Sequence, residues 1–431
     1  MARRIDVASL LRRFKRRPPG QTFLLISIAL VVLLGVSALA VDIGDLWTTR
    51  RLMQSAADAG AVAGADEIAI GGSSTAITAA AKDAASHNGF ADGGTRPGTS
   101  NTITVAVHNP PTSGPYAANS NAVEVDVSQT QPTYFMKVLG MQTVPVSTTA
   151  VAVTTGSGSC IYSLDPSVSD AVDVGGTASV SSACGMYVNS DSSSALIVHG
   201  GGTITAPLVG VVGGTTISGG GSSPPSTGIA QFGDPLAYIA EPNIGSNPCP
   251  GGFHTQNLSN PSYSPQTFCG GIKITGGSVN FTSGLYIIDG GGITFNGGTI
   301  TGTGVTFYLT GNNGKGSSAA NYSGVTINGN ATVNFSSPCT SSGGSIAGML
   351  FFQDRSITNG AASSINGSSG STFSGAIYFP TTPLAYAGNT GSNMFTLLIS
   401  DSLSFLGNST VGNNFSCLAD GSLIKDAALV E

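Results

Sequence analysis

Charged side chains are scarce in this sequence of 431 residues, since Asp, Glu, Lys and Arg together make up 9% of it, against about 25% in an ordinary globular protein. Tryptophan occurs once. No Gly-x-Ser-x-Gly motif is present, and the one loop that resembles a phosphate loop, Gly311 to Ser317, has Gly instead of Ser or Thr after Lys315. These absences argue against serine hydrolases and P-loop nucleotide hydrolases.

Metal-ligand spacing is also missing. There is no Cys-x-x-Cys pair, and no His lies near a Cys at the spacing of a zinc site. The histidines are scattered along the chain and are interpreted as structural: His87, His108, His199 and His254. The sequence therefore predicts no catalytic residue, no cofactor and no metal.

A basic segment followed at once by an apolar run begins the chain. Thr22 to Val41 is twenty residues without a charge, enough to cross the roughly 30 Å hydrocarbon core of a bilayer as a helix. The positive charge before it sets the expected orientation, with the N-terminus in the cytoplasm and the body outside. The topology-setting residues are Arg12, Arg13, Lys15, Arg16 and Arg17.

Two other interpretations of the apolar run remain open. A cleaved signal peptide is one, although its apolar core usually has about 7–15 residues. A pilin-type leader is the other, because Gly20 follows the basic segment. However, the fifth residue after Gly20 is Leu25, where a type IV pilin carries Glu. We expect an uncleaved anchor, and we interpret the basic segment as a topology signal, not a nucleic-acid site.

Residues 42–155 are expected to form a small α+β module. Asp42 to Ile70 contains no proline and places small residues on one helical face, and 75–87 is a second alanine-rich helix. Apolar and polar residues alternate in 103–107 and 123–127, as in half-buried strands, and 144–153 is a third strand. A short helix is expected over 133–139, after Pro132 and before Gly140.

Three ordered motifs in this region resemble the TadE/TadG-like family of Flp pilus-assembly (tight adherence) proteins, over residues 18–154. An Ala-Val-Asp-x-Gly stretch ends the membrane helix, and a Gln-x-Ala-Ala-Asp-Ala helix and a Pro-Thr-Phe-Phe-x-x-x-Leu-Gly element follow. The matching residues are Ala40, Val41, Asp42 and Gly44; Gln54, Ala56, Ala57, Asp58 and Ala59; and Pro132, Thr133, Tyr134, Phe135, Leu139 and Gly140. The resemblance implies envelope-anchored support of adhesive pili, and it supplies no catalytic residues.

The remainder, residues 160–431, consists of short β-branched runs separated by glycine-rich turns. Similar segments recur from Ile272, Ile293 and Val325, each followed by two more apolar runs. About three strands per 20-residue turn predict a right-handed parallel β-solenoid, with a β-sandwich as the alternative. Pro-rich 222–265 is expected to leave the repeat as an excursion. Phe281, Phe295 and Phe335 are expected at equivalent core positions.

Six cysteines follow the apolar run, and an even number outside the membrane fits disulfides in an oxidising compartment. They are Cys160, Cys184, Cys249, Cys269, Cys339 and Cys417. Pairing of sequence neighbours would give 160–184, 249–269 and 339–417, and fifteen pairings are possible. Buried free thiols are the alternative.

The domain order expected is therefore a basic cytoplasmic segment (1–21), a transmembrane helix (22–41), the α+β module and the solenoid. We expect a structural protein of a bacterial inner membrane, extracytoplasmic apart from its basic segment, with the lipid bilayer and pilus-assembly or other envelope proteins as partners. The alternative is an anchored solenoid that binds or cleaves polysaccharide. Acidic residues are sparse in the repeat, and we interpret the pair Asp354 and Arg355 as a capped corner of the chain.

Overall fold

The computed structural model describes residues 19–95, 102–156, 158–245, 249–311, 321–358, 360–389, 391, 394–405, 407–419 and 421–430. The chain divides into two compact units. Unit 1 contains residues up to 155 together with 426–431, and unit 2 contains residues 156–425.

The described residues of unit 1 include two α-helices. Helix α2 (Pro19–Ala69) is one unbroken helix of 51 residues, and α3 (Ser74–His87) follows it. From Phe23, α2 is long and apolar enough to cross a membrane, and the side chains of this apolar stretch are exposed. The Ser73 hydroxyl accepts a hydrogen bond from the Ala76 N–H to cap α3.

A four-stranded sheet packs against these helices. Its order is β1-β2-β3-β32, with β1 (Thr104–His108) and β3 (Thr143–Gly156) both antiparallel to β2 (Ala122–Pro132). Gly60 and Gly64 of α2 have no side chain, so the helix backbone approaches Val125 and Val123 of β2 closely. Apolar residues of α2, α3, β1 and β2 form one core. The three strands and the two long helices predicted for this region are confirmed.

The short helix predicted over 133–139 is smaller than expected. Only Met136–Leu139 is helical, as the 3₁₀ turn η1. Pro132 still pairs with Thr143, and the Thr133 N–H donates to the Gln142 carbonyl at 3.0 Å. The β2–β3 ladder therefore continues through the start of the predicted helix and leaves four residues for the turn.

Strand β32 (Lys425–Val430) pairs at the outer edge of β3. These residues were expected in the solenoid of residues 160–431, but the structure adds them to the sheet of unit 1. Unit 2 is consequently an insertion between two neighbouring strands of that sheet.

The described residues of unit 2 form parallel sheets, and no closed barrel is found among them. The largest sheet has fourteen strands, in which β27 joins two groups. They are β4 (Ser159–Ser163), β7 (Gly185–Val188), β10 (Val209–Val211), β13 (Pro225–Thr227), β15 (Ser262–Tyr263), β16 (Thr267–Cys269), β18 (Ser278–Phe281), β19 (Gly284–Asp289), β21 (Gly298–Thr303), β22 (Val305–Thr310), β24 (Ala331–Ser336), β25 (Met349–Gln353), β27 (Thr372–Phe379) and β29 (Thr396–Ser400).

Two smaller sheets complete the unit. The ten-stranded sheet contains β5 (Val172–Val174), β8 (Leu196–His199), β11 (Thr215–Ser218), β14 (Gln256–Asn257), β17 (Ile272–Ile274), β20 (Ile293–Phe295), β23 (Val325–Ile327), β26 (Ser363–Asn366), β28 (Leu384–Ala387) and β30 (Leu403–Phe405). The four-stranded sheet contains β6 (Ser179–Ser182), β9 (Thr203–Thr205), β12 (Gly221–Ser222) and β31 (Ser409–Val411). Among the described residues, all ladders between named strands of unit 2 are parallel, unlike those of an antiparallel sandwich.

The predicted repeats lie in register. Ile272 pairs with Ile293, and Ile293 with Val325, in three successive parallel strands. Tight glycine corners allow this stacking. Gly291, for example, has φ 67°, and a Cβ there would lie 1.9 Å from the Gly270 carbonyl oxygen.

The three phenylalanines are buried as predicted, but they do not all occupy one position. Phe281 pairs with Gly302, and Gly302 with Phe335, whereas Phe295 lies in another strand column, in register with Ile274. Because Gly302 has no side chain, the rings of Phe281 and Phe335 approach to 6.0 Å between centroids across the intervening strand.

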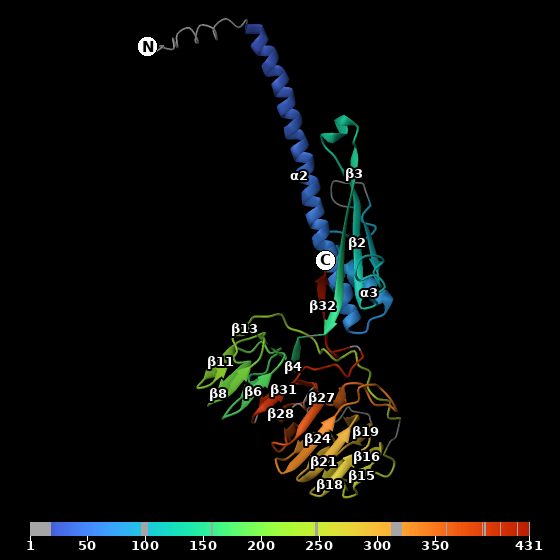
Figure 1. Cartoon of the computed structure of the whole chain (residues 1–431), viewed down its shortest axis with the longest axis vertical. Coiled ribbons are helices and arrows are strands. Elements are labelled where there is room, and N and C mark those ends of the chain that lie inside the picture. Colours follow the sequence, from blue (N-terminus) through green and yellow to red (C-terminus); the bar gives the residue numbers. More distant parts are fainter. Residues whose placement is uncertain are drawn as a thin grey trace, which may run out of the picture. The chain divides into compact units, whose positions relative to one another are not determined.

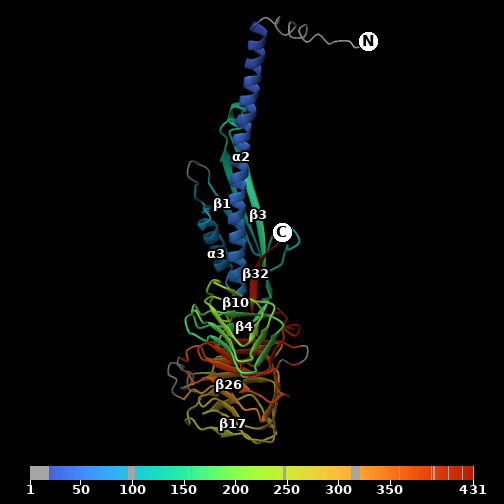
Figure 2. The same ribbon diagram turned by 90° about the vertical axis from the view of Figure 1, so that its left-hand side faces the viewer.

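The turns are not stacked in chain order. The first turn (β4, β5, β6) pairs with the last (β29, β30, β31), so both ends of the insertion lie in the middle of the stack. Figure 2 shows this order within unit 2, where the green early turns border the red last turns and the yellow turns lie at the far end. The chain passes between the two ends of the stack through residues 228–255, inside the excursion predicted at 222–265.

Candidate membrane-proximal site

The carboxylate of Asp42 joins α2 to the tip of the β2–β3 hairpin. It accepts backbone N–H bonds from Tyr134 and Phe135 at 2.9 Å and from Met136 at 2.5 Å. These donors open the η1 turn, whose N–H groups have no partner within the turn. In Figure 1 this tip lies beside the upper part of α2.

Opposing effects act on the Asp42 carboxyl group. Burial raises its pKa, but the three backbone N–H donors and the nearby Lys137 lower it, and the net pKa lies below the ordinary value. Asp42 is therefore charged at neutral pH, and charge-assisted hydrogen bonds hold the tip against the helix.

Two features give the tip its shape. Gly140 ends η1 with φ 90°, a left-handed conformation that costs glycine little. The Thr133 hydroxyl donates to the Met141 carbonyl at 2.5 Å and closes the hairpin. The segment 133–141, called the hairpin tip below, is therefore a defined structure.

Large apolar side chains on the hairpin tip are exposed. Val138 is 82% exposed and Leu139 is 77% exposed. An apolar groove of about 580 Å³ lies between the tip and α2. Its lining includes Leu34, Ala38 and Val41 of α2 and Phe135, Val138 and Leu139 of the tip.

Polar contacts lie one turn beyond the groove. The Gln131 side-chain amide donates to the Asp45 carboxylate at 2.8 Å, and the Gln131 side-chain oxygen Oε1 accepts a hydrogen bond from the Gln129 side-chain amide at 3.1 Å. Trp47 is exposed on the same part of α2. The surface of unit 1 thus changes from apolar at residues 34–41 to polar and aromatic at 45–47, the order found where a helix leaves a bilayer.

The other residues singled out in the sequence are spread over the chain. Thr22 and Val41 both lie in α2, whereas Arg12, Arg13, Lys15, Arg16 and Arg17 lie outside the described residues. Disulfides join Cys160 to Cys184 and Cys249 to Cys269, as two of the neighbour pairings anticipated. The third predicted pairing, 339–417, is wrong: Cys339 and Cys417 are free thiols that contact each other.

Asp354 and Arg355 lie at the end of β25. The Asp354 carboxylate is buried and accepts hydrogen bonds from the Thr310 hydroxyl at 2.6 Å and the Ser356 N–H at 2.8 Å. The Arg355 guanidinium donates to the carbonyls of Leu236 at 2.7 Å and Ile239 at 2.9 Å. Arg355 therefore fastens residues 228–245, called the strap below, to the sheet.

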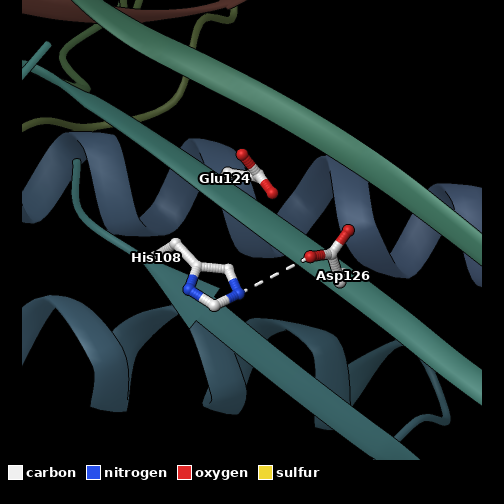
Figure 3. A group of neighbouring side chains, drawn as sticks. All are labelled: His108, Glu124 and Asp126. Atoms are coloured by element: carbon white, nitrogen blue, oxygen red, sulfur yellow. Dashed lines mark ion pairs between the residues drawn. The ribbon is translucent and has the colours of Figure 1, made fainter. Parts of the chain in front are cut away.

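Sequence reasoning missed one cluster in unit 1. It treated His108 as isolated, but the structure places it beside Glu124 and Asp126 (Figure 3). The alternation of Glu124 and Asp126 on one predicted strand was visible in the sequence. The sequence did not show that this strand pairs with the strand that carries His108.

The comparisons with known proteins concern the N-terminal region. A family model for TadE/G-like Flp pilus assembly matches residues 20–67, and one for Tad-like Flp pilus assembly matches residues 56–152. No curated protein and no solved structure shows a significant match to the chain. Asp42 and the hairpin tip, which carry two of the three motifs, contact each other inside the matched region. These matches confirm the resemblance: the family models for TadE/G-like and Tad-like Flp pilus assembly together cover residues 20–152 of this chain.

Proposed function

We propose that this chain is a single-pass protein of the bacterial inner membrane that supports the assembly of Flp-type pili or the adhesion they mediate. The family match over residues 20–152 supports the pilus role, and the apolar stretch of α2 supports the anchor. The five basic residues before the stretch favour a cytoplasmic N-terminus. The α+β module of unit 1 and the whole of unit 2 then lie outside the cytoplasm, where disulfides persist.

The single observation that carries the membrane assignment is the apolar groove between α2 and the hairpin tip. Leu34 and Val41 are seven residues apart in one helix, which corresponds to about 10 Å along its axis. A tip that packs beside these residues enters the outer leaflet when α2 spans the bilayer. Val138 and Leu139 are then buried in lipid, and each such side chain contributes about 1.5–3 kcal/mol.

Unit 2 is best explained as a right-handed parallel β-solenoid with a structural role. Three columns of parallel strands and stacked glycine corners support this architecture. A structural role is supported by Asp354 and Arg355, whose polar groups engage the protein's own chain. The proposed partners are the lipid bilayer and other proteins of the pilus-assembly system.

Deletion of the gene in its native host, with restoration of full-length variants, tests the proposal. The wild-type chain should restore surface pili and adherence. The double variant Val138→Glu and Leu139→Glu should restore them poorly, because two charges would enter the apolar groove. A matched control, Ile217→Glu, alters a partly exposed apolar residue in unit 2 and should behave as wild type. Pili that are unchanged by the deletion itself would overturn the pilus role.

A further inference from the structure

Three metal-ligating side chains converge on one face of the unit 1 sheet. His108 is directly opposite Glu124 in the antiparallel ladder of β1 and β2, and Asp126 is two residues further along β2. Side chains two apart on a strand point to the same face. The intervening Val125 points to the other face and is buried in the core formed with the helices. Figure 3 shows the three side chains gathered over the two strands.

The separations suit one small cation. One ligand atom from each residue lies within 4.8 Å of the others, and the His108 Nε2 is 3.6 Å from an Asp126 carboxylate oxygen. Zinc–ligand bonds of about 2.0–2.2 Å place tetrahedral ligands roughly 3.4 Å apart. His108 and Asp126 are close to this spacing, and a small movement of Glu124 completes it.

Hydrogen bonds already orient both carboxylates. Glu124 accepts the Thr112 N–H at 2.9 Å and the Thr112 hydroxyl at 3.0 Å, and Asp126 accepts the Thr149 hydroxyl. Each carboxylate oxygen has two lone pairs, so the same oxygen can accept a hydrogen bond and bind a metal ion at the same time. Such outer contacts fix ligand orientation in metal sites.

The charge balance also favours a cation. Glu124 is only 4% exposed and lies beside a second carboxylate. Within the described part of the chain, neither acid forms an ion pair with Lys or Arg, and Asp126 has only His108 as an ionic partner. A buried carboxylate next to another is costly without a compensating positive charge.

We propose that His108, Glu124 and Asp126 bind a divalent transition-metal ion, with Zn²⁺ as the best match. One imidazole and two carboxylates are ligands that such an ion accepts, whereas Mg²⁺ and Ca²⁺ prefer all-oxygen sites. His108 and Asp126 are partly exposed, so the ion can enter from solvent and a water can fill the fourth position. The bound ion links the end of β1 to β2 and, through Thr112, to the loop between them.

Calorimetric titration of the full chain with Zn²⁺ tests this site. The chain is purified in detergent without a histidine tag and is treated with a chelator beforehand. We expect one ion per chain, a higher melting temperature with Zn²⁺, and at least a 100-fold loss of affinity in His108→Ala. Asp126→Asn provides a second variant that keeps the side-chain volume and should also weaken binding.

His87→Ala is the matched control, because His87 forms an exposed pair with Asp83 at 3.4 Å on a helix and is outside the cluster. It should bind Zn²⁺ as the wild type does. The Co²⁺-loaded wild type should show the visible absorption of a low-symmetry site, and His108→Ala should lose it. The proposal would be overturned if no binding were seen at about 0.1 mM Zn²⁺, a concentration at which only a weak surface site would remain empty. It would also be overturned if His87→Ala and His108→Ala lost the same amount of Zn²⁺ affinity.

Discussion

The Asp42 carboxylate accepts the backbone N–H of Phe135 at 2.9 Å, although the two residues are 93 positions apart in the sequence. It holds the hairpin tip against α2 at the point where the apolar stretch of the helix ends. Because it accepts three backbone hydrogen bonds from the tip, this carboxylate is expected to determine how firmly the tip is held.

Replacement Asp42→Asn should loosen the tip. The neutral amide keeps one acceptor oxygen, so the three N–H bonds are weakened and one or more is lost. Amide hydrogen exchange at residues 134–136 should become at least tenfold faster, measured by mass spectrometry in detergent. Asp45→Asn is the control, since Asp45 contacts the Gln131 side chain and not the tip backbone. Equal exchange in the two variants would contradict this role.

The same contact should depend on pH. The pKa of Asp42 is lowered in the folded protein, so its contribution is fully present above the ordinary value of about 4. It is lost as the pH falls through the lowered folded value. Exchange at residues 134–136, corrected for its intrinsic pH dependence, should therefore be constant from pH 8 to about pH 5 and rise below about pH 4.

Insertion of the tip in the bilayer can be measured by fluorescence. Trp47 is the single tryptophan, so Trp47→Phe supplies a silent background. Val138→Trp in this background, in liposomes, should emit at short wavelength and be quenched by brominated acyl chains. Val168→Trp, at a partly exposed site in unit 2, should emit as in water. Emission of the residue 138 probe at the wavelength of the control would rule out insertion.

Gly302 should tolerate no large side chain. A Cβ there would lie 3.1 Å from Val305 and 3.2 Å from the Phe335 ring. Gly302→Val should lower the free energy of unfolding of unit 2 by about 1–3 kcal/mol, measured by urea denaturation. Gly276→Val is the control, because nothing lies within 4 Å of a Cβ at Gly276, and it should change stability by less than about 0.5 kcal/mol.

Arg355→Met should release the strap. It removes the donors to Leu236 and Ile239 and leaves Asp234 and Glu241 without their cation. A local loss of about 2–3 kcal/mol is expected, visible as faster proteolytic cleavage within residues 228–245. Lys273→Met removes a positive charge from β17 and serves as the control. Unchanged cleavage of the strap in Arg355→Met would show that other contacts hold it.

The cysteines should differ in reactivity. Alkylation of the unfolded chain without reductant should modify two of the six, Cys339 and Cys417. In the folded chain Cys339 should react first, because burial, with a further effect of the adjacent Cys339, raises the pKa of Cys417 to about 11. Mass spectrometry after proteolysis identifies the sites. Modification of neither would indicate a third disulfide.

Local patterns in the sequence were sufficient to predict most elements. The apolar run from Thr22 to Val41 gave a continuous helix, and alternation gave the strands of the α+β module, because both depend on neighbouring residues. The repeat from Ile272 also predicted the register of its strands, because equivalent residues stack. Neighbouring cysteines were paired correctly where one turn separates them.

Long-range pairing was decided only by the tertiary structure. Nothing local indicates that β32 returns to β3, or that the first turn of unit 2 pairs with its last. The contact of Asp42 with the hairpin tip and the meeting of His108 with Asp126 likewise depend on which strands become neighbours. The sequence by itself therefore determined the helices, the strands and the repeat. The fold decided which distant side chains share a site, because that follows from the packing of whole elements and not from the preferences of single residues.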